Sequence, residues 1–451
     1  MPETARHLAC TILNSLDSDA YLTLDQALTV NDPALSQLSR KDRAFLNALV
    51  FGVLRWRNRL DHIIGALSKT PLKKVDKPVL TILRLAVFQL QFMDRVPPSA
   101  AVNTAVDLVK QNGSPSFIAN YVNGLLRNVI RKSDQIPLPD VGVDPVMALS
   151  FEQSFPFWMI KRWINRFGPD ATQTLCQALN VIPGITLRVN TLKISRKDLQ
   201  DLLAANKIET EATDCSPYGL KLTHHYDRVD SLPGFNEGFF QVQDEAAQLV
   251  SLLLAPQPGD RVLDACAGLG GKTGHMAQMM SDSGGIWAVD VDRNKLEKLA
   301  REMERIHVHI VQPVRGDFTR PFTLADDELF DRVLVDAPCS GLGVIRRNPD
   351  IKWRTVKKNL SRYHKRQCML LANASASVKP NGTLVYAVCS TEPEETDQVV
   401  RAFLSSHDDF SIGSHVPPAL SPLLSDEGYL RLLPHQVDMD GFFAVKFFRN
   451  G

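Results

Sequence analysis

Two cysteines stand in short polar turns at the ends of two predicted strands. Cys339 lies in the run DAPCSG at 336–341, and Cys389 lies in the run YAVCST at 386–391. A glycine-rich turn, Asp264–Thr273, precedes both of them in the chain. Such a turn can hold a nucleotide-like cofactor, and a thiolate can attack a ring carbon. Together these features favour methyl transfer onto a pyrimidine.

The chemistry of cytosine explains why a thiol would be needed. Carbon 5 is a weak nucleophile, but addition of a thiolate to carbon 6 makes it enamine-like, so that it can take a methyl group from a sulfonium. The scheme also needs an acid near ring nitrogen 3 and a base that removes the proton at carbon 5. Asp336, three residues before Cys339, could hold the edge of the base. Both cysteines follow neighbouring strands and should face one crevice, so spacing alone leaves open which of them attacks.

The glycine-rich turn joins a strand expected at Arg261–Ala265 to a helix that begins near Lys272. Its three glycines, at 268, 270 and 271, let the backbone approach a ligand closely, and the helix N-terminus behind them offers unpaired N–H groups. A P-loop is disfavoured because Cys266 stands where the first glycine of that motif belongs. A dinucleotide-binding fingerprint is disfavoured as well, because Thr273 replaces its third glycine.

Three aspartates follow successive predicted strands, which is where ligands bind in doubly wound sheets. Asp290 could accept the two hydroxyls of a ribose, Asp317 could meet the edge of an adenine, and Asp336 ends the fourth strand. Because of these carboxylates, a cofactor site is a better interpretation of the glycine turn than a purely structural turn.

The composition excludes several other classes. The seven cysteines are scattered, odd in number and without a CxxC pair, which argues against a disulfide framework and against a metal site. Free thiols fit a reducing cytoplasm. We expect no membrane span, because no run of apolar residues is long enough, and no signal peptide, because no basic segment leads into an apolar run.

The charge of the chain is unevenly distributed. Its formal net charge is +1, but residues 1–132 carry 17 Lys and Arg against 10 Asp and Glu. A basic N-terminal part suggests an anionic partner. A solvated helical surface explains the same excess equally well, so charge alone does not decide.

Hydrophobic periodicity predicts three domains. Residues 1–135 form a helical bundle with a buried central helix at Lys77–Met93. A proline-rich linker, Ile136–Pro145, leads to a small α/β domain at 146–245. Residues 246–451 alternate strands and helices, which predicts a parallel doubly wound sheet, and Tyr429–Arg449 adds an antiparallel edge hairpin. The fold class is therefore multidomain, with a Rossmann-like C-terminal domain.

A basic loop with an aromatic residue follows the first thiol turn, at Arg346–Trp353. Such a loop can grip phosphate and stack on a base, so Arg346 and Arg347 are candidate RNA contacts. A surface loop with internal charge pairs is the alternative.

These motifs resemble those of the RNA 5-cytosine methyltransferases (the NOL/NOP/Sun family), most closely its bacterial branch acting on small-subunit rRNA. The similarity includes FQVQDEAA at 240–247, DAPCSG at 336–341, RNPD at 347–350 and DGFF at 440–443, and it extends over nearly the whole chain. The N-terminal bundle is similar to the NusB-type RNA-binding domain of these enzymes. Where the family commonly has Ala-Pro, this chain has Gly268-Leu269, which should loosen the turn slightly.

The resemblance implies S-adenosyl-L-methionine (SAM) as cofactor and a cytosine of small-subunit (16S) rRNA as substrate. It implies that Cys389 is the nucleophile, that Cys339 assists product release, and that Lys272 lies near the active site. The implied SAM contacts are Cys266, Ala267, Gly268, Leu269, Gly270, Gly271, Lys272, Asp290, Asp317 and Asp336. A monomer without a metal is expected. The alternatives are a tRNA cytosine methyltransferase, a non-catalytic RNA-binding or ribosome assembly factor, and, disfavoured by Cys266, a P-loop ATPase.

Overall fold

The computed structural model describes residues 4–224, 226, 228–322, 329–413 and 416–451. The chain divides into two compact units. Unit 1 comprises Met1–Val181 and Arg347–Lys357, and unit 2 comprises Ile182–Arg346 and Lys358–Gly451. The segment Arg347–Lys357 interrupts unit 2 in the sequence yet belongs to unit 1, which the sequence pattern did not reveal.

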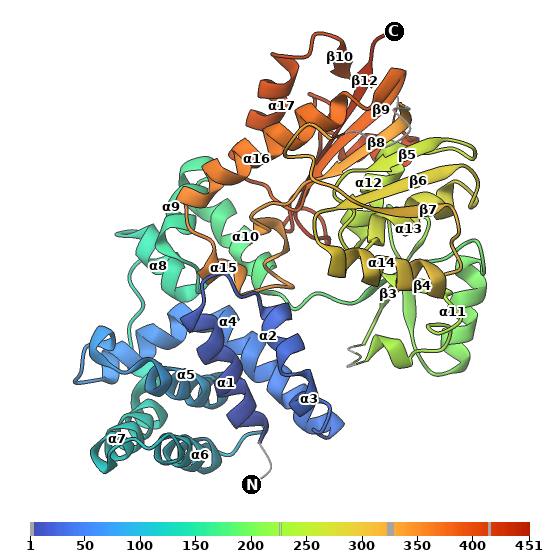
Figure 1. The fold of residues 1–451 in the computed structure, drawn as a ribbon. Helices are drawn as coiled ribbons and strands as arrows, with labels where there is room; N and C mark the ends of the chain where they lie inside the picture. Colours follow the sequence, from blue (N-terminus) through green and yellow to red (C-terminus); the bar gives the residue numbers. More distant parts are fainter. Residues whose placement is uncertain (1–3, 225, 227, 323–328, 414–415) are drawn as a thin grey trace. The chain divides into compact units, whose positions relative to one another are not determined.

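Unit 1 is helical, and Figure 1 shows its N-terminal part as a bundle. Its helices are α1 (Ala5–Ser18), α2 (Leu24–Val30), α3 (Asp32–Leu35), α4 (Arg40–Leu67), α5 (Lys77–Phe92), α6 (Pro98–Gln111), α7 (Ser116–Lys132), α8 (Pro145–Glu152), α9 (Phe157–Phe167), α10 (Pro169–Asn180) and α15 (Ile351–Arg354).

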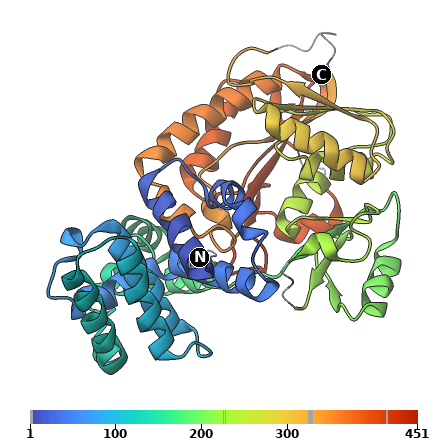
Figure 2. The ribbon, with the colours of Figure 1, turned by 60° about the horizontal axis from the view of Figure 1, so that its bottom comes forward.

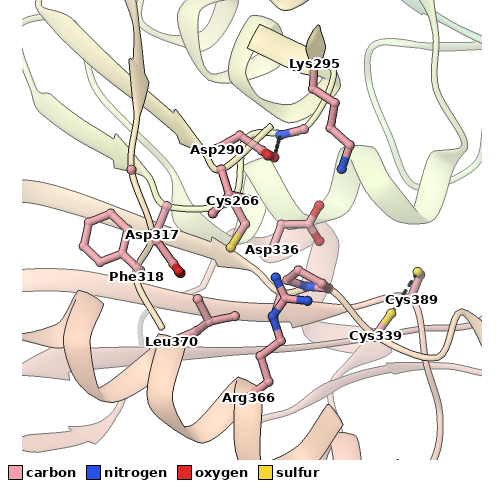
Figure 3. Close-up of a pocket in the computed structure, with 16 residues that line it drawn as sticks. Cys266, Asp290, Lys295, Asp317, Phe318, Asp336, Cys339, Arg366, Leu370 and Cys389 are labelled. Atoms are coloured by element: carbon pink, nitrogen blue, oxygen red, sulfur yellow. Dashed lines mark hydrogen bonds between the residues drawn. The ribbon is translucent and has the colours of Figure 1, made fainter. Parts of the chain in front are cut away.

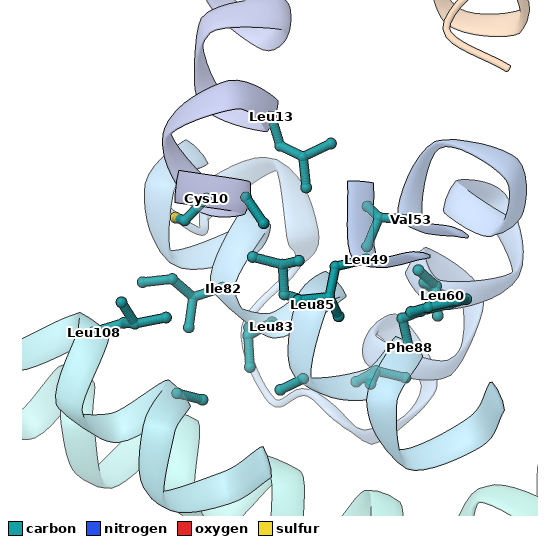
Figure 4. Packing of buried hydrophobic residues seen from close by; sticks show 14 of the residues in the cluster. Cys10, Leu13, Leu49, Val53, Leu60, Ile82, Leu83, Leu85, Phe88 and Leu108 are labelled. Atoms are coloured by element: carbon teal, nitrogen blue, oxygen red, sulfur yellow. The ribbon is translucent and has the colours of Figure 1, made fainter. Parts of the chain in front are cut away.

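Helix α5 is the buried centre of the bundle, as its apolar sequence predicted. Ile82, Leu83 and Leu85 are almost fully buried and pack among residues of α1, α4 and α6 (Figure 4). Helices α4 and α5 approach closely at Gly52, where any Cβ would overlap the ring of Phe88. The bundle therefore depends on apolar packing along α5 and on one small residue.

The structure differs from the predicted helices between residues 24 and 38. The apolar residues of Leu24–Leu38 have helical spacing and predict one helix, but the structure has two, α2 and α3, separated at Asn31, because Pro33 cannot donate the backbone hydrogen bond that would continue the first. Helices α8 to α10 lie at the end of the first stretch of unit 1, and the α/β domain is expected from residue 146.

Unit 2 begins with a four-stranded antiparallel sheet in the order β2-β3-β1-β4. Its strands are β1 (Thr186–Val189), β2 (Thr210–Ala212), β3 (Gly219–Leu222) and β4 (Phe240–Val242), and helix α11 is Arg196–Ala205. Leu187, Leu199, Leu220 and Phe240 form the centre of its core.

The rest of unit 2 is built on an eight-stranded sheet in the order β10-β12-β9-β8-β5-β6-β7, with β11 paired to β12. The strands are β5 (Arg261–Asp264), β6 (Gly285–Asp290), β7 (Val311–Arg315), β8 (Phe330–Asp336), β9 (Val378–Val388), β10 (Phe410–Ile412), β11 (Leu430–Leu432) and β12 (Phe442–Arg449). The helices are α12 (Glu245–Leu254), α13 (Gly271–Met279), α14 (Arg293–Arg305), α16 (Lys358–Ser375) and α17 (Asp397–Leu404).

Strands β5 to β9 run parallel, whereas β12 is antiparallel to β9 and pairs with β11, so the predicted edge hairpin is confirmed. Successive residues of the strands face opposite sides: Val262 packs with α12 to α14, and Leu263 packs with α16 and α17. Figures 1 and 2 show α14 in yellow and α16 in orange on different sides of these strands. Strands β6 and β7 lie on one side of β5, and β8 lies on its other side. The strand order therefore reverses between β5 and β8. Ligands bind at such a switch point.

Candidate active site

A cavity of about 330 Å³ lies at the carboxyl ends of the parallel strands of unit 2 (Figure 3). This volume is in the range of small-molecule sites, roughly 300–1,000 Å³. The residues that line it are Ala265, Cys266, Gly268, Asp290, Val291, Lys295, Gly316, Asp317, Phe318, Asp336, Ala337, Pro338, Cys339, Arg366, Leu370 and Cys389. The three predicted aspartates and both predicted thiols therefore share one cavity.

The two thiols are in contact. The Sγ atoms of Cys339 and Cys389 lie 3.1 Å apart. Cys389 directly follows β9, and Cys339 follows β8 by three residues. The hydrogen bond to Cys389, together with burial, raises the pKa of the Cys339 thiol well above its ordinary value. Cys339 therefore keeps its proton and can donate it to the Cys389 sulfur.

The glycine turn is closed by the carboxylate of Asp290, whose Oδ2 accepts the Gly268 N–H at 3.0 Å. Gly268 and Gly270 have φ values of +58° and +84°, and a Cβ at Gly270 would lie 2.7 Å from Leu299. Burial raises the pKa of Cys266 well above the ordinary range of a thiol, so this cysteine is an inert part of the turn.

A partly buried ion pair lies beside the thiols. The Lys272 ammonium donates to Asp336 Oδ2 at 2.6 Å and lies 5.0 Å from the centre of the Phe442 ring. Burial opposes the charge on Lys272, but Asp336 outweighs it and raises the pKa of the ammonium. The carboxyl of Asp264 accepts a hydrogen bond from Thr273, and burial raises its pKa to about 7. One charged pair and one carboxyl that is protonated in part at neutral pH therefore lie near the cavity, and of these groups Asp336 lines it.

Some residues of the expected cofactor turn do not line the cavity. Ala267, Leu269, Gly270, Gly271 and Lys272 lie behind or beside it, and Leu269 is exposed. The glycines in this group shape the turn. Lys272 contacts Asp336, which lines the cavity.

Arg346, a predicted RNA contact, lies buried within unit 2, and its RNA contact stays a prediction. Its guanidinium is 3% exposed and pairs with three carboxylates of unit 2, those of Asp244, Asp438 and Asp440. A guanidinium enclosed in this way cannot reach a phosphate without leaving its partners. Arg347 is partly exposed and belongs to unit 1, so its RNA contact stays a prediction.

The sequence analysis missed several residues that line the cavity. Val291 and Phe318 each follow one of the predicted aspartates, so the strand-end rule itself could have found them. Arg366 and Leu370 come from α16, and a helical pattern does not reveal which of its turns faces a ligand. Figure 3 shows the Arg366 guanidinium pointing toward Asp336 and Cys266.

Among the residues that the structure describes, no group of three or more His, Cys, Asp or Glu side chains could hold a metal ion. No helix in this described part of the chain is long and apolar enough to cross a bilayer.

Three sequence families match the chain in succession. Residues 3–131 match the NusB family, residues 155–228 match the ferredoxin-like domain of RsmF/B-like methyltransferases, and residues 251–448 match the family described as 16S rRNA methyltransferase RsmB/F. This order agrees with the helical bundle, the small antiparallel sheet and the doubly wound sheet.

Whole-chain relatives and solved structures agree with these matches. A probable ribosomal RNA small subunit methyltransferase B from Synechocystis is 37% identical over 98% of both chains, and one from Bacillus subtilis is 35% identical over 92% of both. The crystal structure of PH0851 covers 99% of this chain and 98% of its own, with a TM-score of 0.82 and 27% identity. A methyltransferase homolog from Pyrococcus horikoshii covers 68% of this chain and 99% of its own, with a TM-score of 0.58 and 26% identity.

The doubly wound sheet, its antiparallel edge and the cavity at its switch point define a Rossmann-like methyltransferase domain. An all-α NusB domain and a small ferredoxin-like domain precede it. The chain belongs to the RsmB type of the Sun family of methyltransferases.

Proposed function

We propose that this protein transfers a methyl group from SAM to carbon 5 of a cytosine in small-subunit (16S) rRNA, through a covalent cysteine–cytosine intermediate. The observation that carries the proposal is the contact between two thiols, at 3.1 Å, inside a cavity lined by three strand-end carboxylates. A rRNA substrate is supported by the names of the relatives, which are small-subunit rRNA methyltransferases.

The residues of the cavity fit SAM. Asp290 can accept the ribose hydroxyls, Asp317 can accept from the adenine edge, and Phe318 and Val291 offer apolar surface near both. Gly268, held by Asp290 with positive φ, leaves the turn without a side chain toward the ligand. When bound, SAM supplies an activated methyl group on a sulfonium.

Cys389 acts as the nucleophile in this proposal. Its thiolate adds to carbon 6 of cytosine and a proton is taken up at nitrogen 3, so that carbon 5 gains the electron density needed to accept the methyl group. Once carbon 5 carries the methyl group, nitrogen 3 gives up the proton that it took, a base removes the proton from carbon 5, the bond between Sγ and carbon 6 breaks, and the thiolate is regenerated. Cys339, which keeps its proton beside Cys389, assists this release.

The charges around Cys389 suit these steps. Lys272 places an ammonium near the thiolate, and that charge is fixed by Asp336. A partly buried cation favours the thiolate over the thiol and offsets negative charge that develops on the ring. The Asp336 carboxylate, which lines the cavity, can also hold the edge of the base.

RNA binding in the proposal rests on the NusB domain and on Arg347. Residues 1–132 carry 17 Lys and Arg against 10 Asp and Glu, whereas the rest of the chain is net acidic, and Arg347 is partly exposed. Affinity should therefore fall as salt rises, because phosphate contacts release counterions. The target base must leave its stack to reach the cavity, which costs a few kcal/mol unless it lies in a loop.

The test is substrate-resolved methylation. The protein is incubated with methyl-labelled SAM and unmodified transcripts of small-subunit rRNA or tRNA, and the digested nucleosides are analysed by mass spectrometry, with Cys389→Ser as the control. Label in 5-methylcytosine of the rRNA supports the proposal. Label in tRNA alone would favour the tRNA enzyme, and RNA binding without any label would favour an assembly factor.

A further inference from the structure

The two thiol turns are joined by a third buried group, the carboxylate of Glu395. Glu395 ends the short 3-10 helix Pro393–Glu395 that follows Cys389, and it is fully buried. It does not line the cofactor cavity and takes no part in the proposed chemistry.

Both carboxylate oxygens accept hydrogen bonds from residues next to the thiols. Oε1 accepts the backbone N–H of Ser340 at 2.8 Å and the side-chain amide of Gln367 at 3.1 Å. Oε2 accepts the hydroxyl of Ser390 at 2.6 Å and the hydroxyl of Ser340. Ser340 directly follows Cys339, and Ser390 directly follows Cys389. One carboxylate thus bridges the two residues adjacent to the reactive pair.

The bridge acts where the sheet no longer holds the two turns together. The hydrogen bond from Ala337 N–H to the carbonyl of Ala387 is the last one between β8 and β9. Beyond it, the Gly343 N–H donates to the Cys389 carbonyl, and the Ser340 and Ser390 hydroxyls lie 3.3 Å apart. Glu395 accepts from both hydroxyls and so bridges the two turns. Gln367 strengthens this bridge, because its amide also donates to the Pro338 carbonyl at 3.1 Å.

A buried carboxylate at this place is costly unless it is fully hydrogen-bonded. Burial raises the pKa of Glu395, while the bonds from Ser340 and Ser390 act against that rise. An apolar side chain would avoid the desolvation cost but would leave both serine hydroxyls without this acceptor. The carboxylate of Glu395 thus accepts hydrogen bonds from both thiol turns at once.

We propose that Glu395 is a positioning residue of the methyl transfer: its carboxylate ties Ser340 to Ser390 and thereby holds the Cys339 and Cys389 sulfurs in contact. The effect on catalysis rests on the proposed function. The contact between the sulfurs is a property of the protein alone and can be measured without RNA or SAM.

The test compares full-length wild type with Glu395→Ala, Glu395→Gln and Glu394→Ala. Glu394 is the matched control, since it lies one residue away and is partly exposed. Diamide oxidises two neighbouring thiols to a disulfide and takes up their two electrons and two protons. The rate of the Cys339–Cys389 cross-link, followed by peptide mass spectrometry, therefore reports how often the sulfurs meet.

We expect the cross-link to form about tenfold or more slowly in Glu395→Ala, with a matching fall in kcat and an unchanged Kd for SAM, because a displacement near 1 Å is enough for such losses. Glu395→Gln should recover most of both rates, since it keeps one acceptor oxygen and the serine hydroxyls can turn to accept from its amide. Glu394→Ala should behave as wild type.

A cross-link that forms in Glu395→Ala as fast as in wild type overturns the proposal. So does a slower cross-link with unchanged kcat. If Glu395→Ala does not fold, the double variant Ser340→Ala/Ser390→Ala replaces it, because it removes the hydroxyl bonds and leaves the carboxylate two other donors. A wild-type protein that cross-links rapidly but methylates no cytosine would refute the proposed function and leave the cross-link comparison as a valid test of Glu395.

Discussion

The Sγ atom of Cys339 lies 3.1 Å from the Sγ atom of Cys389, although 50 residues separate them in the chain. Adjacent parallel strands, β8 and β9, bring the two turns to the same edge of the sheet. The hydrogen bond between the thiols and burial raise the pKa of the Cys339 thiol well above its ordinary value, so Cys339 can donate its proton to the neighbouring sulfur. Two thiols in contact, one of which holds its proton, can divide attack and release between them.

The two cysteine variants should therefore fail in different ways. Cys389→Ala should form neither 5-methylcytosine nor a covalent complex with rRNA, since it lacks the attacking atom. Cys339→Ala should accumulate the covalent complex on a denaturing gel, because release is impaired. Cys368→Ala, a change of the same type in α16, serves as the control. The reverse pattern would keep the chemistry but exchange the two roles.

Loss of the Lys272 charge should impair the chemical step. Lys272→Met removes the ammonium that Asp336 holds beside the thiols, and we expect kcat to fall about 100-fold, in line with the loss of one preorganised electrostatic group. Because the two residues act as a pair, Lys272→Met/Asp336→Asn should cost less than the sum of the single changes. Rapid-quench methylation assays measure the effect, and the exposed Lys298→Met on α14 is the control. Additive losses would show that the pair does not act as a unit.

Removal of the Asp290 carboxylate should weaken cofactor binding. Asp290→Ala frees the Gly268 N–H and removes the acceptor for ribose hydroxyls, so the Kd for SAM should rise about tenfold or more, which corresponds to about 1.4 kcal/mol. Isothermal titration with SAM measures it directly, without RNA. Asp201→Ala, on an exposed part of α11, should leave the Kd unchanged. An unchanged Kd for Asp290→Ala would place the ribose elsewhere.

The carboxyl of Asp264 should make stability fall with rising pH. Its pKa is about 7 in the folded protein against 3.8 ordinarily, so the folded state binds more protons than the unfolded state between these values. The stability from the neutral form is complete below pH 4 and is lost as the pH rises through 7, at most about 4 kcal/mol. Asp264→Asn should flatten this dependence while keeping the bond from Thr273. Urea unfolding at pH 5 and pH 8 tests it, and equal slopes in both proteins would contradict it.

The local sequence was sufficient to locate a site residue where that residue directly follows a strand. The ends of β5, β6, β8 and β9 could be located from alternation and turn residues, and this alone placed Asp290, Asp336 and both cysteines in one cavity. The sequence could not show which of several neighbouring residues of the same type contacts the site. Glu392, Glu394 and Glu395 follow Cys389 in one acidic turn, and only the three-dimensional structure shows which carboxylate bridges the thiol turns.

The basic loop after Cys339 shows the opposite case, in which composition misled. Its charges suggested a phosphate-binding surface, yet Arg346 pairs with aspartates of unit 2 and the following residues belong to unit 1. Trp353 donates to the Leu54 carbonyl and packs against the core of the bundle, so it is not free to stack on a base. Charge and aromatic content do not distinguish a surface loop from one that is anchored at long range.

Lys352 in the same segment should therefore act on stability rather than on RNA affinity. It is fully buried, and its ammonium donates to the Arg55 and Ser154 carbonyls and to Asn180 Oδ1 at 3.1, 3.1 and 2.7 Å. Burial lowers its pKa well below the ordinary value, as expected for an amine held by neutral acceptors. Lys352→Met leaves these three acceptors without their donor.

We expect Lys352→Met to destabilise unit 1 by about 2–5 kcal/mol, because unsatisfied buried acceptors are costly. Thermal unfolding and limited proteolysis of the full chain measure this loss, and Lys357→Met, an exposed lysine of the same segment, is the control. At a temperature where both variants are folded, their affinity for rRNA and the salt dependence of binding should match. A stable Lys352→Met protein with weaker, less salt-dependent binding would restore the loop as a phosphate contact.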